Sequence, residues 1–244
     1  MLAMFGICII TGSWGTLVGG QGLVTIPTLI LLGLPPHTAI GTNLMGMTGV
    51  AGAGWYKFHK KRMVNYKIGF MIGLPTAVGA ILGANLVFHI NEEMLRRIIA
   101  ILTVLILVFI VVVKPTMGIE KASHDVKRYE YLSGTVISLF LGIYGGFYGP
   151  GTATFLSYIL IVLFRQTFLE SAATVKIAVL SVTTLAALIF AINGAVDYYL
   201  ASAMFIGGFI GSYIGAHYSD RIGNVWVKRL FIVVVLLMAT KMIW

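Results

Sequence analysis

Two uncharged stretches, each broken near its middle by glycines, constrain the fold of this chain more than any other feature. Residues 1–34 and 131–164 contain no Asp, Glu, Lys or Arg, and their glycine breaks lie at 15–22 and 145–151. A membrane-spanning helix needs about 20 apolar residues. Each stretch is therefore too long for one crossing and too short for two full crossings with a turn. We expect each to form a pair of short or re-entrant helices that meet at membrane depth, where irregular backbone is tolerated only against a cavity or inside protein.

The rest of the chain is built from apolar runs of roughly membrane-spanning length. The chain is 59% hydrophobic and only 10% charged, whereas soluble domains carry about 25% charged residues. A soluble enzyme and a nucleic-acid-binding domain are excluded, and Cys8, the only cysteine, excludes a disulfide scaffold within the chain. We expect an all-α polytopic membrane protein that is embedded in the lipid bilayer. The six runs are 39–56, 68–88, 98–113, 177–196, 198–219 and 230–244.

The net charge of +9 comes from basic clusters between these runs, which is the pattern that sets membrane orientation. The most basic loop, around Lys57–Lys67, is assigned to the cytoplasm. Counting crossings forward places Glu92 and Glu93 outside and the linker 115–130 inside. These assignments predict a multi-pass protein with a cytoplasmic linker.

The sequence repeats itself weakly but in order. At an offset of 130, Gly12, Gly15 and Gly19 fall on Gly142, Gly145 and Gly149, and at 132 Thr42 falls on Thr174. The basic loop near Lys57 has a counterpart at 193–197 without Lys or Arg, which fits two inverted repeats better than parallel ones. We therefore divide the chain into residues 1–114, the linker 115–130 and residues 131–244, each half a short-helix pair followed by three transmembrane helices.

Inverted repeats with broken helices are typical of secondary transporters, whose half-helix N-termini point at an anionic substrate near the midplane. Lys176 is the sharpest candidate, because a charge in an apolar run needs a cavity or a partner; the alternatives are snorkelling or a pair with Glu170. For Thr42 and Asn43 the alternative role is helix capping. For the glycine breaks the alternative is a plain turn between two short helices. The predicted substrate-binding residues are Gly19, Gly20, Gln21, Gly22, Thr42, Asn43, Gly149, Gly151, Thr152, Thr174 and Lys176.

Three aromatic residues flank the breaks and are candidates for gating: Trp14, Tyr144 and Tyr148. The glycines spaced four apart at 79/83 and 207/211/215 are interpreted as helix packing positions. The five histidines are scattered, no Cys pair exists and no phosphate-binding loop is present. We therefore expect no metal, no cofactor and no enzymatic activity. An anion channel with opposed half-helices is the main rival function, and the chain could act as a monomer or a homo-oligomer.

Several of these motifs together resemble the sulfite exporter TauE/SafE family, also called the 4-toluene sulfonate uptake permease family. They are the first glycine break followed by Pro27, the segment Ala39-Ile40-Gly41-Thr42-Asn43, the second break followed by Ala173-Thr174-Val175-Lys176, and the Gly-Ala pairs at 83–84 and 215–216. The resemblance covers essentially the whole chain. It implies transport of a small sulfur-containing anion such as sulfite, a sulfonate or thiosulfate across the bacterial plasma membrane. Alternating access of the two halves is the expected mechanism.

Overall fold

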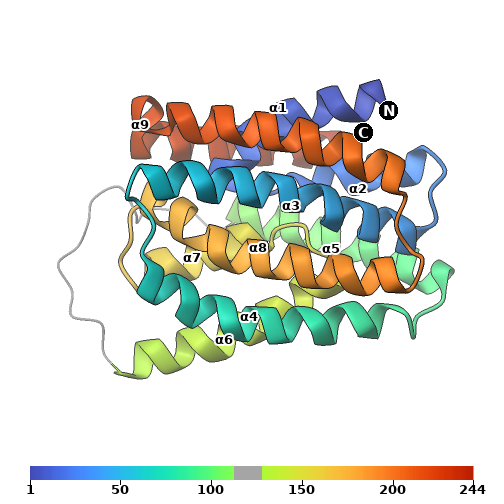
Figure 1. The fold of residues 1–244 in the computed structure, drawn as a ribbon, viewed down its shortest axis with the longest axis horizontal. Helices are drawn as coiled ribbons and strands as arrows, with labels where there is room; N and C mark the ends of the chain where they lie inside the picture. Colours follow the sequence, from blue (N-terminus) through green and yellow to red (C-terminus); the bar gives the residue numbers. More distant parts are fainter. Residues whose placement is uncertain (113–127, 244) are drawn as a thin grey trace.

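The computed structural model describes the backbone of residues 1–112 and 128–243, and the side chains of 1–106, 128–219 and Arg221. This part of the chain folds into α-helices with no strand, as predicted (Figure 1). The helices are α1 (Leu2–Val18), α2 (Gly22–Leu31), α3 (Pro36–Lys60), α4 (Tyr66–Val87), α5 (Glu92–Val112), α6 (Arg128–Phe147), α7 (Thr152–Val162), α8 (Phe168–Ile192) and α9 (Tyr198–Ile243).

Both glycine breaks separate a pair of short helices. The first break ends α1 at Val18 and the second ends α6 at Phe147. Gly19 has φ +81° and Gly149 has φ +97°, values that favour glycine because a Cβ would be strained there. Figure 1 shows that α2 returns to the end of the molecule where α1 begins, whereas α7 returns to the opposite end, where α6 begins. The two pairs are therefore hairpins that enter from opposite ends.

Three described helices are long and apolar enough to cross a membrane: Tyr66–Val87, Phe168–Ile192 and the segment Tyr198–Ser219 of α9. They overlap the predicted runs 68–88, 177–196 and 198–219, the second of which continues past the end of α8 at Ile192. The run 39–56 lies in α3, which has 25 residues but carries five glycines and Asn43, and these lower its hydropathy. Much of α3 is buried by neighbouring helices, so it does not need a wholly apolar surface.

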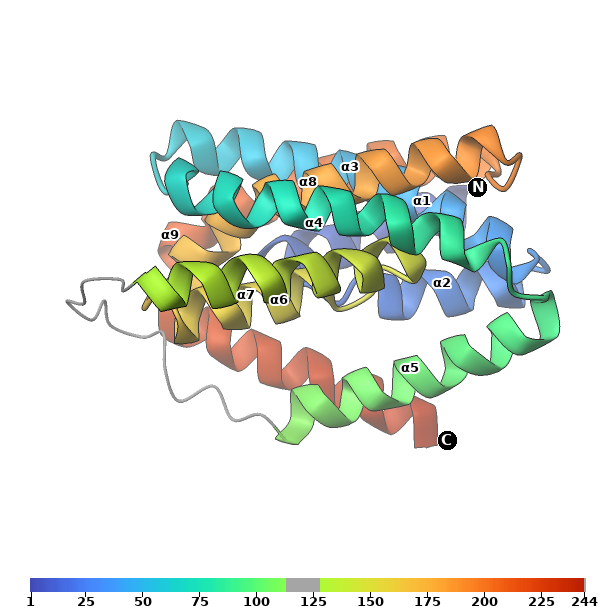
Figure 2. The ribbon, with the colours of Figure 1, turned by 90° about the horizontal axis from the view of Figure 1, so that it is seen from below.

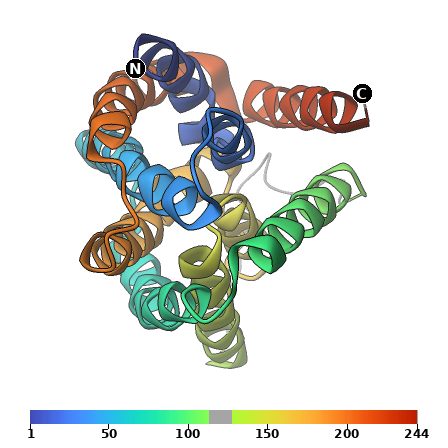
Figure 3. The same ribbon diagram turned by 90° about the vertical axis from the view of Figure 1, so that its right-hand side faces the viewer.

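The predicted separation of the runs 198–219 and 230–244 is wrong for the backbone, because α9 continues through both as one helix of 46 residues. A straight helix of that length would extend about 69 Å, more than twice the hydrocarbon core. Figures 2 and 3 show that α9 instead changes direction, and that its C-terminal part and α5 stand apart from the other helices on the same side. The side chains of the run 230–244, and the end of the run 98–113, lie outside the described residues.

Glycines let two helix pairs approach to backbone contact. A Cβ added at Gly83 of α4 would meet the Ile143 carbonyl oxygen of α6, and one added at Gly215 of α9 would meet the Ser13 carbonyl oxygen of α1. Gly79 and Gly211 make the corresponding approaches to Leu139 and Ile9. The packing interpretation of these glycines is confirmed, since small residues at a spacing of four are how membrane helices pack closely.

Two hydrogen bonds of the same kind tie the central helices α3 and α8 to the starts of α9 and α4. The Thr42 hydroxyl of α3 accepts from the Asp197 N–H at 2.9 Å, and the Thr174 hydroxyl of α8 accepts from the Asn65 N–H at 3.2 Å. Asn65 and Asp197 each cap the following helix, by accepting from the N–H of Ile68 and Leu200 respectively. Both pairs exchange under the repeat offset of 132, so each half anchors the start of a long helix of the other.

Basic residues gather at one end of the bundle. Lys57, Lys60 and Lys61 lie at the end of α3, and Arg128 begins α6 at the same end, whereas Glu92 and Glu93 begin α5 at the other (Figure 1). Most residues of the linker 115–130 lie outside the described part. The side on which the linker lies therefore stays a prediction.

Candidate functional site

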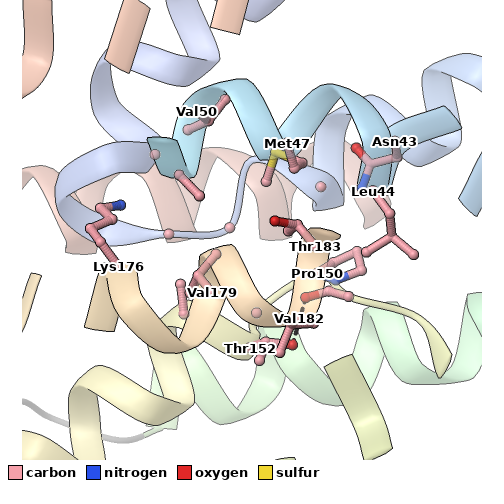
Figure 4. Close-up of a pocket in the computed structure, with 18 residues that line it drawn as sticks. Asn43, Leu44, Met47, Val50, Pro150, Thr152, Lys176, Val179, Val182 and Thr183 are labelled. Carbon is pink, nitrogen blue, oxygen red and sulfur yellow. Dashed lines mark hydrogen bonds between the residues drawn. The ribbon is translucent and has the colours of Figure 1, made fainter. Parts of the chain in front are cut away.

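A cavity lies where the two glycine breaks meet α3 and α8. Figure 4 shows α3 on one side and α8 on the other, with residues of both breaks around it. Its lining residues are Gly15, Gly19, Gly20, Gly22, Asn43, Leu44, Met47, Val50, Ala51, Gly149, Pro150, Gly151, Thr152, Ala153, Lys176, Val179, Val182 and Thr183.

The two breaks touch each other at this cavity. The Thr154 hydroxyl donates to the Val18 carbonyl oxygen at 3.0 Å, and a Cβ at Gly22 would lie 2.8 Å from Cγ of Pro150. The first residues of α2 and α7 therefore border the same space. Because the N-terminus of a helix presents free N–H groups and the positive end of its dipole, this arrangement suits an anion.

Backbone donors remain free at both breaks. Within the described part of the chain, the N–H groups of Gly20, Gly22, Gly151 and Ala153 donate no hydrogen bond. All four residues line the cavity. These N–H groups are among those that every helix leaves without an internal acceptor, so a ligand can use them without breaking the fold.

Among the described residues that line the cavity, Lys176 alone carries a basic side chain. It sits on α8 with 3% of its surface exposed, and among the described residues it makes no hydrogen bond or ion pair. Its stem packs where α3 carries Gly54, since a Cβ there would lie 3.0 Å from Lys176 Cε. Because the Lys176 side chain is buried, it does not snorkel to the membrane interface. The alternative pair with Glu170 is not formed among the described residues, since Lys176 makes no ion pair there; the Glu170 carboxylate accepts from the Thr167 N–H at 3.1 Å in the capping box of α8.

Three uncharged polar side chains complete the lining. Asn43 Oδ1 accepts from the Thr25 hydroxyl at 2.5 Å, which leaves its Nδ2 with no acceptor among the described residues. The Thr183 hydroxyl makes one long contact, 3.3 Å, to the Leu180 carbonyl oxygen. The Thr152 hydroxyl donates to the Gly149 carbonyl oxygen at 2.7 Å. Asn43 and Thr183 therefore keep hydrogen-bonding capacity for a ligand.

Of the eleven predicted binding residues, the structure brings eight to the cavity and leaves out Gln21, Thr42 and Thr174. The two threonine hydroxyls are already used in the reciprocal hydrogen bonds to Asp197 and Asn65. Gln21 is buried against Gly15, and its Oε1 has no partner among the described residues.

The three gating candidates lie beside the cavity rather than in its lining. The Tyr144 hydroxyl donates to the Pro150 carbonyl oxygen, and the Tyr148 hydroxyl lies 2.6 Å from the Thr103 hydroxyl of α5. Both tyrosines therefore brace the second break. Trp14 Nε1 is buried with no acceptor among the described residues.

Sequence inspection missed the apolar walls and Thr183. A helical spacing of three to four residues from Lys176 leads to Val179, Val182 and Thr183, so the signal was present in the sequence. The wall on α3 is its repeat counterpart, because at the offset of 132 Leu44, Met47, Val50 and Ala51 fall on Lys176, Val179, Val182 and Thr183. The cavity thus has two related walls, and only one of them carries a charge.

The described residues offer no group of three His, Cys, Asp or Glu side chains that could hold a metal ion. The charged and hydrogen-bonding groups at the cavity suit an anion better than a metal ion.

Comparison with known proteins identifies related sequences. The model of the family described as "Sulfite exporter TauE/SafE" matches residues 4–242. A probable membrane transporter protein of Haemophilus influenzae is 29% identical over 93% of this chain and 88% of its own length. A probable membrane transporter protein, ORF9, of a Sinorhizobium species is 29% identical over 98% and 91%, and YdhB of Bacillus subtilis, with the same description, is 27% identical over 93% and 92%. The comparison with solved structures found no match.

Proposed function

Because this chain belongs to the sulfite exporter TauE/SafE family, we propose that it is a secondary transporter for a small sulfur-containing anion of the sulfite, sulfonate or thiosulfate type. Membrane transport itself follows from the family and from relatives described as probable membrane transporters. The substrate class and mechanism are the content of the proposal.

The observation that carries the proposal is the buried Lys176 ammonium at the cavity. A charged side chain inside a membrane protein costs at least about 2.5 kcal/mol without compensation. Among the described residues no carboxylate offsets it. A bound anion would supply the missing negative charge, so the site is one in which substrate and protein neutralise each other.

Sulfur oxyanions suit the remaining donors. Their several oxygens can accept from the free N–H groups at the two breaks while one oxygen faces Lys176. Hydrogen bonds to a charged group are worth about 1.5–3 kcal/mol each, roughly twice those between neutral groups. Binding without a metal or a second lysine is therefore energetically adequate.

The mechanism we propose is alternating access by two inverted halves that rock around this site. Three observations support it: the hairpins enter from opposite ends, the hydrogen bonds of Thr42 and Thr174 exchange between halves, and the cavity walls are repeat counterparts. In inverted-repeat transporters the substrate site lies between the repeats near the midplane. Glu170 and Asp197, the nearest acidic residues considered for proton coupling, both act as helix caps here.

We further propose that the protein resides in a bacterial plasma membrane with its basic end, and hence the linker 115–130, in the cytoplasm. The excess of Lys and Arg at that end supports this orientation. The relatives named above come from bacteria.

Uptake by reconstituted liposomes tests the proposal. We expect saturable uptake of radiolabelled sulfite, thiosulfate or a sulfonate, competed by unlabelled substrate and not by chloride. Unitary currents at turnover far above transporter rates would favour the anion channel instead. Absence of uptake of every sulfur anion, with proton or anion gradients imposed, would refute the proposed substrate class.

A further inference from the structure

A buried phenylalanine lies beyond each end of the cavity, and we propose that these two residues are the gates of the transport path. Phe58, the inner gate, closes the path toward the basic end of the bundle, and Phe190, the outer gate, closes the path toward the opposite end. The inference rests on the proposed transport function and assigns residues to the alternating access that it requires. It does not depend on which anion is bound.

Toward the basic end, an apolar cluster follows the cavity. Its buried members are Leu17, Val18, Phe58, Leu169, Ala173 and Ala216. Phe58 is wholly buried and lies one helical turn beyond Gly54, where an added Cβ would be 3.0 Å from Lys176 Cε. On the other wall, Ala173 lies one turn before Lys176 in α8. The cluster therefore covers the cavity on the side where α3 ends and α8 begins.

The surface of the basic end lies beyond this cluster. Met63 and Val64 follow the end of α3, Phe168 begins α8, and all three pack against the cluster while remaining partly exposed. A substrate that leaves the cavity in this direction must displace the ring of the inner gate. Apolar constrictions close a membrane path by excluding water, so a buried phenyl ring at this position is suited to that task.

Phe190 occupies the equivalent position at the opposite end. It follows Phe58 by 132 residues, which is the repeat offset, and it is also wholly buried. On α8 it lies about two turns beyond Thr183 of the cavity lining. Its Cβ lies 2.8 Å from the position of a Cβ added at Gly41 of α3, and its ring centroid is 5.0 Å from that of Phe88. Phe190 therefore bridges the two walls past the outer end of the cavity.

The neighbours of the two gates are repeat counterparts as well. At the offset of 132 Ala84 falls on Ala216, and at 130 Val18 falls on Tyr148. Val18 and Ala216 belong to the cluster of the inner gate, and Tyr148 and Ala84 belong to that of the outer gate. Each gate thus packs with the end of the first helix of one hairpin. Alternating access requires one such set of contacts to open while the other stays closed, and two equivalent sets at opposite ends meet that requirement.

The test is the rate at which a cysteine inside the cavity is labelled from each side of the membrane. Val179→Cys places a thiol on the α8 wall (Figure 4). An impermeant thiol reagent is added to one side of oriented liposomes at a time, and Lys60→Cys and Glu92→Cys identify the side of the basic end and the opposite side. The chain without Val179→Cys measures the background from the buried Cys8.

Both phenylalanines are wholly buried, so both variants should respond. In Phe58→Ala the cavity thiol should be labelled at least about tenfold faster from the basic side, because the lost ring stabilises the closed path, and at an unchanged rate from the opposite side. Phe190→Ala should show the reverse. Phe70→Ala, which removes an exposed ring from α4, is the matched control and should change neither rate. Phe58→Leu and Phe190→Leu should show smaller changes in the same directions, and they replace any alanine variant that does not yield monodisperse protein.

Faster labelling from one side only, and from opposite sides in the two variants, supports the paired gates. Equal acceleration from both sides, a side-specific effect in only one variant, or rates no faster than in Phe70→Ala would overturn them. Labelling needs no substrate, and uptake of the sulfur anions is measured separately without the cysteine. The gates can therefore fail while uptake persists, and the substrate class can fail while labelling remains side-specific.

Discussion

Adding a single methyl group at Gly83 tests the close packing that holds the second hairpin against α4. In Gly83→Ala the new Cβ would meet the Ile143 carbonyl oxygen and lie 2.8 Å from both Ile143 C and Phe147 N. Ordinary contacts of a Cβ begin near 3.4 Å. The helices α4 and α6 must therefore separate locally by at least about 0.6 Å, and neither contact is with a side chain that could rotate away.

A gap of that size removes a quarter or more of the dispersion energy across the contact, and overpacking a tight interface typically costs about 1–3 kcal/mol. The matched control is Gly52→Ala in α3, where a new Cβ has nothing within 4 Å. This variant should be stabilised by about 0.5–1 kcal/mol, because alanine favours the helix over glycine. The two identical substitutions are thus expected to act in opposite directions.

Thermal unfolding in detergent, followed by loss of the monodisperse chromatographic peak, measures both variants. Gly83→Ala should unfold at least about 3 °C below Gly52→Ala, using about 2–4 °C per kcal/mol for a chain of this size. Gly215→Ala, which would meet the Ser13 carbonyl oxygen, should behave like Gly83→Ala. Equal unfolding temperatures for Gly83→Ala and Gly52→Ala would refute the packing argument.

Three other predictions concern hydrogen bonds of single side chains and the orientation in the membrane. Thr42→Val and Thr174→Val each leave a backbone N–H without its acceptor and should lose about 1 kcal/mol in the same unfolding assay, whereas the serine variants should not. Tyr148→Phe removes the hydroxyl that meets the Thr103 hydroxyl. We expect the rate of substrate uptake to fall while the unfolding temperature changes little. Unaltered uptake would show that bracing the second break has no role in transport. With Cys8 buried, an impermeant thiol reagent should label Lys60→Cys only from the cytoplasmic side and Glu92→Cys only from outside, and the reverse pattern would contradict the assigned orientation.

The sequence was informative where a residue is anomalous for its surroundings. Lys176 stands out because a lysine within an apolar run must be accommodated by a cavity or a partner, and the glycine breaks stand out because 34 uncharged residues cannot form an integral number of crossings. Lys176 and the glycine breaks could therefore be assigned to the candidate site from the sequence alone. The family resemblance, carried by the same motifs, is confirmed by the match over residues 4–242.

Residue types that are unremarkable in a membrane helix could not be assigned to a face. Thr42 and Asn43 are neighbours, yet Asn43 reaches the cavity and Thr42 bonds to the Asp197 N–H, because successive helical residues point about 100° apart. Thr183 was overlooked because a threonine in a helix usually bonds to its own backbone. The continuation of α9 through 220–229 was missed because Asp220 and Arg221 suggest a loop, although polar residues are compatible with helix wherever the helix leaves the membrane.

The measurement that bears most directly on the account is anion uptake by liposomes containing Lys176→Met, compared with Lys67→Met, which removes an exposed lysine at the start of α4. Methionine keeps the length and apolar stem of lysine and removes its charge, so folding should be preserved. The account predicts that Lys176→Met loses saturable uptake of the sulfur anion by at least about tenfold in kcat/KM, while Lys67→Met transports as the wild type does. Undiminished uptake and affinity in Lys176→Met would contradict the central claim that this ammonium binds the substrate.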